Sequence, residues 1–169
     1  MSKQQLPPEN TEASFAMYGE TVIDRPLNEV WSASLEFPFW FFSNKAVERL
    51  RGDRGEVGDT IVTNGVMRNE IVALRPRKSV TWKFSPMLTD GVHVIFYDLE
   101  LAAENRQTRL SMRYFSQRGW PSEMARQMLE ELAHGKTPYF MHQVLAAFKA
   151  NLETGITHEA YERMNGTAP

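Results

Sequence analysis

The order in which the apolar spacing changes along the chain is the feature that most constrains its fold. Residues 14–23 alternate with a period of two, and two aromatic-rich segments with helical spacing follow. Five further strand-like segments come next in succession, and a long C-terminal stretch returns to helical spacing. This order predicts an α+β fold. In it, a curved antiparallel sheet of six to seven strands wraps around a long C-terminal helix, with two short helices after the first strand.

The boundaries follow from breakers and caps. The expected strands are 14–23, 60–63, 67–74, 80–84, 92–103 and 108–116. Their connections are too short for parallel crossovers, so neighbouring strands should be antiparallel. Helical spacing is expected after Pro26 and again from Phe37 through Val47 and Leu50. A helix over 122–134 should break near Pro138 and resume over 139–153.

The chain has 169 residues, 42% of them hydrophobic, which suits one domain with a full core rather than two. We predict a single domain at 13–153. Residues 1–12 are expected to form a disordered lead, because they are mostly polar and proline-containing and have little to bury. Residues 154–169 are expected to form a polar tail.

Composition and charge exclude several kinds of protein. A formal net charge of -2 gives no footprint for nucleic acid, and the lack of cysteine excludes disulfides and thiolate chemistry. No apolar run approaches the roughly 18 residues of a membrane span. The first residues lack the apolar centre of a signal peptide, which favours a cytoplasmic location.

These elements, in this order, resemble the START-like, or Bet v 1-like, helix-grip superfamily. Within it, the chain looks most like the polyketide cyclase/dehydratase and Hsp90-activator-homology branches. The segments that carry the resemblance are 21–26, 29–31, 55–59, 72–77, 80–82 and 108–110, with Leu145, Phe148, Lys149, Leu152 and Glu153 near the end. Proteins similar to this pattern include cyclases, lipid and hormone binders and Hsp90 activators, so the resemblance does not choose between these functions.

Strand parity predicts which side chains face the interior. In residues 92–103, Asp98 and Glu100 alternate with apolar residues and should face solvent. The opposite parity, and therefore the inner face, holds His93, Ile95, Tyr97, Leu99 and Leu101. The same argument places Arg68 and Glu70 inside with Val72 and Leu74, Trp82 with Val80 and Phe84, and Tyr114 with Leu110 and Met112. A β-bulge in any of these strands would reverse part of this assignment.

Three of these inward polar residues, Glu70, His93 and Tyr97, are the candidate catalytic residues. A carboxylate or an imidazole could transfer a proton while a tyrosine hydroxyl stabilises an enolate, which suits cyclisation or dehydration of a ligand. The alternative is that these are satisfied core or rim residues. An inward Glu70 would also need a partner, for which Arg68 and Arg113 are the candidates.

Apolar and aromatic residues are predicted to line the ligand site. The candidates are Phe39, Trp40, Trp82, Ile95, Met112, Tyr114, Met141 and Leu145. The alternative is that the aromatic cluster at 37–42 and the methionines only fill the core. The histidines do not have the spacing of a metal site, and no nucleotide-binding motif is present, so no metal and no cofactor is expected.

The predicted function is binding of a small hydrophobic molecule, aromatic or polyketide-like, in an internal cavity. Its enzymatic version is a cofactor-free cyclase or dehydratase. The alternatives are a non-catalytic carrier or sensor, and a protein-binding module that regulates a chaperone. The sheet edges and the tail leave a homodimer open.

Overall fold

In the computed structural model the described residues are 16–38, 47–63, 67–86, 95–115 and 136–164. The strands are β1 (Ala16–Ile23), β2 (Val47–Arg51), β3 (Thr60–Thr63), β4 (Met67–Arg75), β5 (Ser79–Pro86), β6 (Ile95–Glu104) and β7 (Gln107–Phe115). The helices are α1 (Leu27–Ser34), α4 (Lys136–Thr154) and α5 (His158–Met164). Residues 1–12, for which we predicted a disordered lead, lie outside the described ranges.

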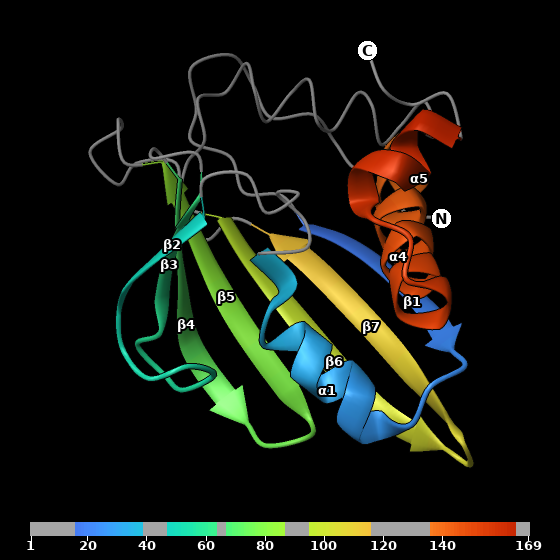
Figure 1. Cartoon of the computed structure of the whole chain (residues 1–169), viewed down its shortest axis with the longest axis horizontal. Helices are drawn as coiled ribbons and strands as arrows, with labels where there is room; N and C mark the ends of the chain where they lie inside the picture. The colour runs from blue at the N-terminus through green and yellow to red at the C-terminus, as the bar shows by residue number, and fades with distance from the viewer. Residues whose placement is uncertain (1–15, 39–46, 64–66, 87–94, 116–135, 165–169) are drawn as a thin grey trace.

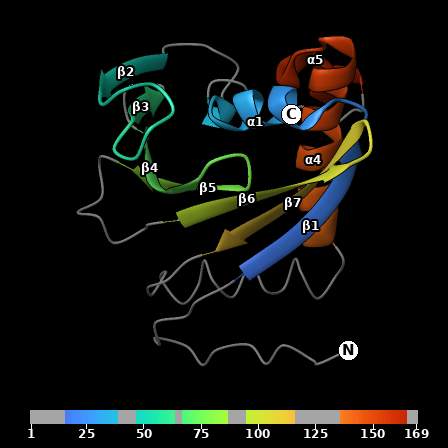
Figure 2. The ribbon, with the colours of Figure 1, turned by 90° about the horizontal axis from the view of Figure 1, so that it is seen from below.

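All seven strands form one antiparallel sheet in the order β1-β7-β6-β5-β4-β3-β2. The first strand therefore pairs with the last, and β1 and β2 form the two edges. Figure 1 shows α1 lying across one face of the sheet and α4 alongside β1. Viewed at right angles, the sheet is strongly curved and its concave side faces α1 (Figure 2). The predicted α+β helix-grip architecture is confirmed.

The segment at Val47 to Arg51 corrects the sequence prediction. We expected helical spacing to continue through Val47 and Leu50, but these residues form the edge strand β2, paired with β3. A spacing of three residues is compatible with either structure over so short a segment, and the partner strand decides the outcome. In the aromatic-rich segment 37–42, Phe37 and Pro38 are helical and follow shortly after α1. Residues 39–42 lie outside the described residues.

Helix α4 begins at Lys136, two residues before Pro138. Proline is tolerated in the first turn of a helix, because the amide hydrogens there have no acceptor within the helix. The helix expected over 122–134 and the break after it lie outside the described residues. After α4, Gly155 takes a positive φ of 78° and its amide donates to the carbonyl of Asn151, which ends the helix. The predicted tail then forms the short helix α5.

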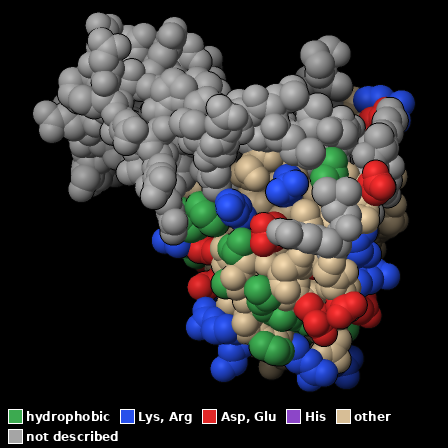
Figure 3. Space-filling model, turned by 90° about the vertical axis from the view of Figure 1, so that its left-hand side faces the viewer, with side chains coloured by type: hydrophobic (Ala, Val, Ile, Leu, Met, Phe, Trp, Pro, Cys, Tyr) green, Lys and Arg blue, Asp and Glu red, His purple; other side chains and the backbone are tan. Residues whose placement is uncertain are grey.

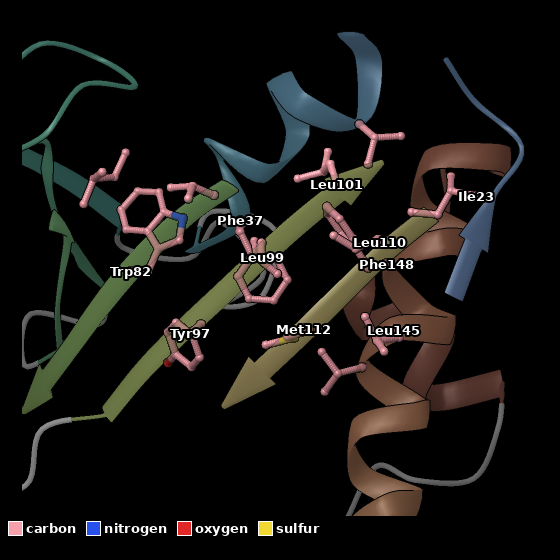
Figure 4. Packing of buried hydrophobic residues seen from close by; sticks show 14 of the residues in the cluster. Ile23, Phe37, Trp82, Tyr97, Leu99, Leu101, Leu110, Met112, Leu145 and Phe148 are labelled. Atoms are coloured by element: carbon pink, nitrogen blue, oxygen red, sulfur yellow. The ribbon is translucent and has the colours of Figure 1, made fainter. Parts of the chain in front are cut away.

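The hydrophobic core lies between the concave face of the sheet, α1 and α4. Figure 4 shows side chains from all three meeting there. The fully buried members include Ile23, Val30, Ile61, Ile71, Val80, Trp82, Leu99 and Leu110, with Leu145 and Phe148 contributed by α4. Because both helices cover the same face of the sheet, this face is the interior of the protein and the opposite, convex face is the outer one.

Candidate functional site

The strand register places a row of aromatic residues across the middle of the concave face. Trp82 of β5 lies opposite Tyr97 of β6, and Tyr97 lies opposite Tyr114 of β7. The next row joins Val80, Leu99 and Met112 in the same way. The inward placement predicted for these three strands is confirmed by the burial of Trp82, Tyr97, Leu99, Leu101, Leu110 and Met112.

Five aromatic rings from different parts of the chain meet on this face. We call Phe37, Phe84, Tyr97, Tyr114 and Phe148 the aromatic cluster. The Tyr97 ring centroid lies 5.3 Å from that of Tyr114, 5.9 Å from that of Phe84 and 6.1 Å from that of Phe37. Phe148 of α4 packs edge-on against Phe37 at 5.3 Å. Tilted and edge-on contacts of this kind are favourable for aromatic pairs and connect the sheet to both helical segments.

The two tyrosine hydroxyls are the polar groups of this cluster. Tyr97 is 4% exposed, and burial raises the pKa of its hydroxyl well above its usual value, with a smaller contribution from the charge that Tyr114 would carry. Burial likewise raises the pKa of Tyr114. Both hydroxyls are therefore protonated at neutral pH, so they can donate a hydrogen bond but cannot act as bases.

Glu70 does not face the interior, and its predicted inward position is wrong. A β-bulge between Ile71 and Ala73 inserts one extra residue into β4, which reverses the alternation expected from Leu74. Ile71 lies opposite the buried Trp82, so Glu70, opposite Lys83, is on the convex face.

The same bulge moves Arg68 to the convex face, opposite Ser85. Arg113, the other candidate partner for an inward Glu70, is also outside. It donates to the Asp98 carboxylate at 2.7 Å, and its guanidinium lies 4.0 Å from the Phe115 ring centroid.

Asn69 takes the inner position that parity had assigned to its neighbours. It is fully buried, lies opposite Phe84, and its side-chain amide donates to the Ile61 carbonyl at 3.4 Å. The sequence did not predict Asn69 as an inward residue. The extra residue of the bulge is Val72, and a valine does not signal a bulge as a glycine or proline would. Asn69 is an uncharged polar residue on the same face as the two tyrosines.

The structure separates the other predicted site residues into three groups. Met112 and Leu145 are buried on the inside, and Trp82 is completely buried with its indole N–H donating to the Ser34 carbonyl at 3.1 Å. Trp82 thereby attaches α1 to the sheet. Ile95 is the first residue of β6 and lies opposite Phe84, and Met141 belongs to α4, but neither side chain is described. His93, Phe39 and Trp40 lie outside the described residues.

The concave face is almost free of charge. Its described charged residues are Arg49 and the fully buried Asp59, which form a pair in which the Arg49 guanidinium donates two hydrogen bonds of 2.7 and 3.1 Å to the Asp59 carboxylate. Charged side chains of both signs lie instead on the outside, where Figure 3 shows them interspersed. The inner face therefore suits an apolar molecule with few polar groups better than an ion.

The residues that the structure describes contain no group of three or more histidine, aspartate or glutamate residues placed to hold a metal ion. Within the same ranges, no helix has the length and apolar character required to cross a membrane.

Comparison with known proteins gives matches at the level of structure. No family of known proteins matches the sequence, and no curated protein matches it either. Among solved structures, Ara h 8.0201 superposes with a TM-score of 0.57 at 12% identity, over 84% of this chain and 99% of that chain.

Two other solved structures superpose to a similar degree. The Aha1 dimer from Colwellia psychrerythraea gives a TM-score of 0.55 at 19% identity, over 83% of this chain and 98% of that chain. DynU16, encoded in the dynemicin biosynthetic locus, gives 0.56 at 19% identity, over 85% of this chain and 49% of that chain. At these identities the similarity establishes the fold and not the activity. The seven-stranded antiparallel sheet, its helices and these neighbours together show that the chain has the START-like, or Bet v 1-like, helix-grip fold.

Proposed function

We propose that this protein binds a small hydrophobic molecule, aromatic or polyketide-like, against the concave face of the sheet beneath α4. The observation that carries the proposal is the aromatic cluster, in which rings from β5, β6, β7, α4 and the residues after α1 converge on a nearly uncharged face. Apolar sites with a few convergent polar groups are typical of small-molecule binding. The two tyrosine hydroxyls and Asn69 are those groups here.

Binding without general acid/base catalysis by Glu70 is the version that the geometry favours. Glu70 lies on the convex face, and the protonated tyrosines can stabilise negative charge but cannot remove a proton. The cyclase or dehydratase version of the function therefore needs another base. His93 is the remaining candidate from the sequence, and Tyr97 would then act as a hydrogen-bond donor.

Native mass spectrometry tests binding directly. The freshly purified protein should show an excess mass that is lost when the same sample is denatured. The neutral fluorescent dye Nile red provides a second measurement, because its emission rises when it enters an apolar site. We expect saturable enhancement with wild type.

A matched pair of variants locates the binding site. Met112→Phe adds a bulky ring beside Tyr97 and Tyr114 on the inner face, whereas Ser111→Phe adds the same ring on the convex face. We expect Met112→Phe to weaken dye binding and Ser111→Phe to leave it unchanged. If wild type neither carries a molecule nor binds the dye, the proposal is wrong. Equal loss of binding in both variants would place the dye elsewhere.

The catalytic version has its own test once a bound molecule is identified. His93→Ala should abolish turnover of that molecule while leaving its affinity within about twofold, because a proton-transfer group contributes mainly to the transition state. Loss of affinity without any measurable turnover in wild type would favour a carrier or sensor.

A further inference from the structure

We propose that the convex face of the sheet carries a phosphate-binding site formed by Arg68, Lys83 and Ser85. The ligand is a phosphate monoester whose organic part is aromatic and lies beside Phe96. This site is on the opposite side of the sheet from the aromatic cluster, so the inference goes beyond the proposed function and does not depend on it.

The strand register brings the three polar side chains together. Arg68 of β4 lies directly opposite Ser85 of β5. Lys83 precedes Ser85 by two residues in the same strand, so its side chain leaves the same face of the sheet. Diagonal neighbours on adjacent strands are about 7–8 Å apart, which is within reach of long side chains. All three residues are half-buried.

Arg68 has an unmet hydrogen-bonding requirement. Its Nε is buried and has no hydrogen-bond acceptor, although buried polar atoms are normally paired. Within the part of the chain that the structure describes, neither Arg68 nor Lys83 forms an ion pair. Like charges on neighbouring strands disfavour each other, and an anion between the two would compensate both.

Three other arginines on the convex face show what Arg68 lacks. Each has a carboxylate within ion-pair distance: Arg75 with Glu100 at 3.6 Å, Arg109 with Glu20 at 3.0 Å, and Arg113 with Asp98 at 2.7 Å. The charges of this face are therefore paired around these arginines and left uncompensated at Arg68 and Lys83.

Glu70 is the carboxylate closest to the site in the strand register, and it does not neutralise these cations. It lies directly opposite Lys83. Glu70 makes an interaction of its own, but among the described residues no ion pair joins it to Lys83 or Arg68. Two cations beside one carboxylate leave the site with a net positive charge, which favours an anionic ligand.

The three donors differ in a way that suits phosphate. Arginine presents a planar fork of N–H groups, lysine a compact ammonium and serine a hydroxyl. Donors that approach one point from two strands can reach different oxygens of a tetrahedral anion, whereas a carboxylate offers only two oxygens in one plane. A phosphate monoester also carries a charge of about −1.5 to −2 at neutral pH, which matches two cations.

Phe96 extends the site on the side away from Arg68. It belongs to β6 and lies directly opposite Lys83. Its ring stacks on that of Phe115, with centroids 5.4 Å apart and an interplanar angle of 21°. Both phenylalanines are half-buried, so part of this aromatic surface is open to a ligand. An aromatic group attached to the phosphate can pack against it.

An NMR titration of backbone amides in the full-length protein tests the inference at constant pH and ionic strength. The probes are inorganic phosphate, phenyl phosphate and phenol. We expect both phosphates to give saturable shifts at Arg68, Lys83 and Ser85, with phenyl phosphate binding several-fold tighter. Phenol alone should leave these three amides unchanged.

Arg68→Gln and Lys83→Gln should each weaken phenyl phosphate binding by about tenfold, because each removes a charge-assisted hydrogen bond. Arg75→Gln is the matched control, because it removes the same charge from the same face at an arginine that already has a carboxylate partner. Its affinity should stay within about twofold of wild type. If Arg68→Gln does not fold, Lys83→Gln and the shifts in wild type decide the question.

Three results would overturn the inference. Absence of saturable shifts at the three amides would rule out the site. Equal weakening by Arg75→Gln and Lys83→Gln would show a general attraction of anions and no defined site. Equal affinity for inorganic phosphate and phenyl phosphate would overturn the aromatic class of ligand. Nile red binding should be unchanged in all these variants, so failure here leaves the proposed function standing, and a failure of dye binding leaves this inference standing.

Discussion

The Lys149 ammonium donates a hydrogen bond of 2.7 Å to the backbone carbonyl of Val22. Val22 belongs to β1, which is an edge strand and has a strand partner on one side only. One helical turn further along α4, Glu153 accepts a hydrogen bond of 2.7 Å from the amide of Asp24, just beyond the end of β1. The helix thus provides two polar partners for the backbone at this end of the strand. These contacts attach α4 to the sheet and block part of an edge that could otherwise pair with another strand.

Replacing Lys149 by methionine should destabilise the protein, because the Val22 carbonyl loses its partner while most of the aliphatic stem is retained. Lys149 is partly exposed, so water can replace some of the interaction, and we expect the free energy of unfolding to fall by about 1 kcal/mol. Urea unfolding measures this change. Lys78→Met, on an exposed turn, is the control and should change stability little. Wild-type stability of Lys149→Met would show that the contact does not hold the helix.

Replacing Asp59 by asparagine should have a larger effect. The Asp59 side chain is fully buried, and it accepts hydrogen bonds from the Arg49 guanidinium and, at 2.9 Å, from the amide of Gly55. Asparagine removes the charge that the Arg49 guanidinium binds, but Arg49 is 29% exposed and also lies 3.7 Å from the Glu36 carboxylate. We therefore expect a loss of about 2 kcal/mol in unfolding free energy. Chemical denaturation of Asp53→Asn, at an exposed position of the same loop, provides the reference. Equal stabilities of the two variants would contradict the structural role of Asp59.

Two glycines of that loop give a matched comparison of backbone strain and steric conflict. Gly52 and Gly58 both have positive φ values, 86° and 94°. A Cβ at Gly52 would lie 2.7 Å from the Gly58 carbonyl oxygen and 2.8 Å from the Asp59 backbone, whereas a Cβ at Gly58 meets nothing within 4 Å.

Gly58→Ala should therefore show only the conformational penalty, about 1 kcal/mol, and Gly52→Ala should lose clearly more. Thermal unfolding of both variants in one buffer tests the order. If Gly58→Ala is the less stable variant, the close approach at Gly52 is not as described.

The buried Tyr97 and the partly buried Tyr114 should make stability fall at alkaline pH. Their folded pKa values lie above the unfolded value of about 10, so their contribution is complete below pH 10 and is lost as pH rises through the folded pKa. Unfolding free energy measured over this alkaline range should decrease less steeply in Tyr97→Phe than in wild type. A spectroscopic titration of tyrosinate should lose signal from its most alkaline part in the same variant. Ionisation of Tyr97 near pH 10 in folded protein would contradict its burial.

The alternation of residues in β5, β6 and β7 was sufficient to predict their inner faces. Asp98 alternates with Tyr97 and Leu99, and the strand register confirms the predicted sides. The prediction succeeded because none of these pairings contains a bulge, so a period of two holds along the entire described length. The inward positions of Tyr97, Tyr114, Met112 and Trp82 were therefore available from the sequence.

The face of Glu70 could not be predicted in the same way. One inserted residue at Val72 moves Glu70 to the outside and Asn69 to the inside, and this bulge depends on how β4 pairs with β5. The strand β2 is a similar case, because its five residues become a strand through pairing with β3. The sequence of such a short segment is compatible with more than one local structure.

By itself, the sequence determined the order of the elements apart from β2, the helix-grip fold class and the inward parity of three central strands. These depend on local periodicity and on connection lengths, which a chain carries in its own residues. The tertiary structure decided that the interior is almost uncharged, that Asn69 rather than Glu70 enters it, and that Lys149 binds the backbone of β1. Each depends on strand register or on contacts between residues far apart in the chain, which form only when the sheet and α4 pack together.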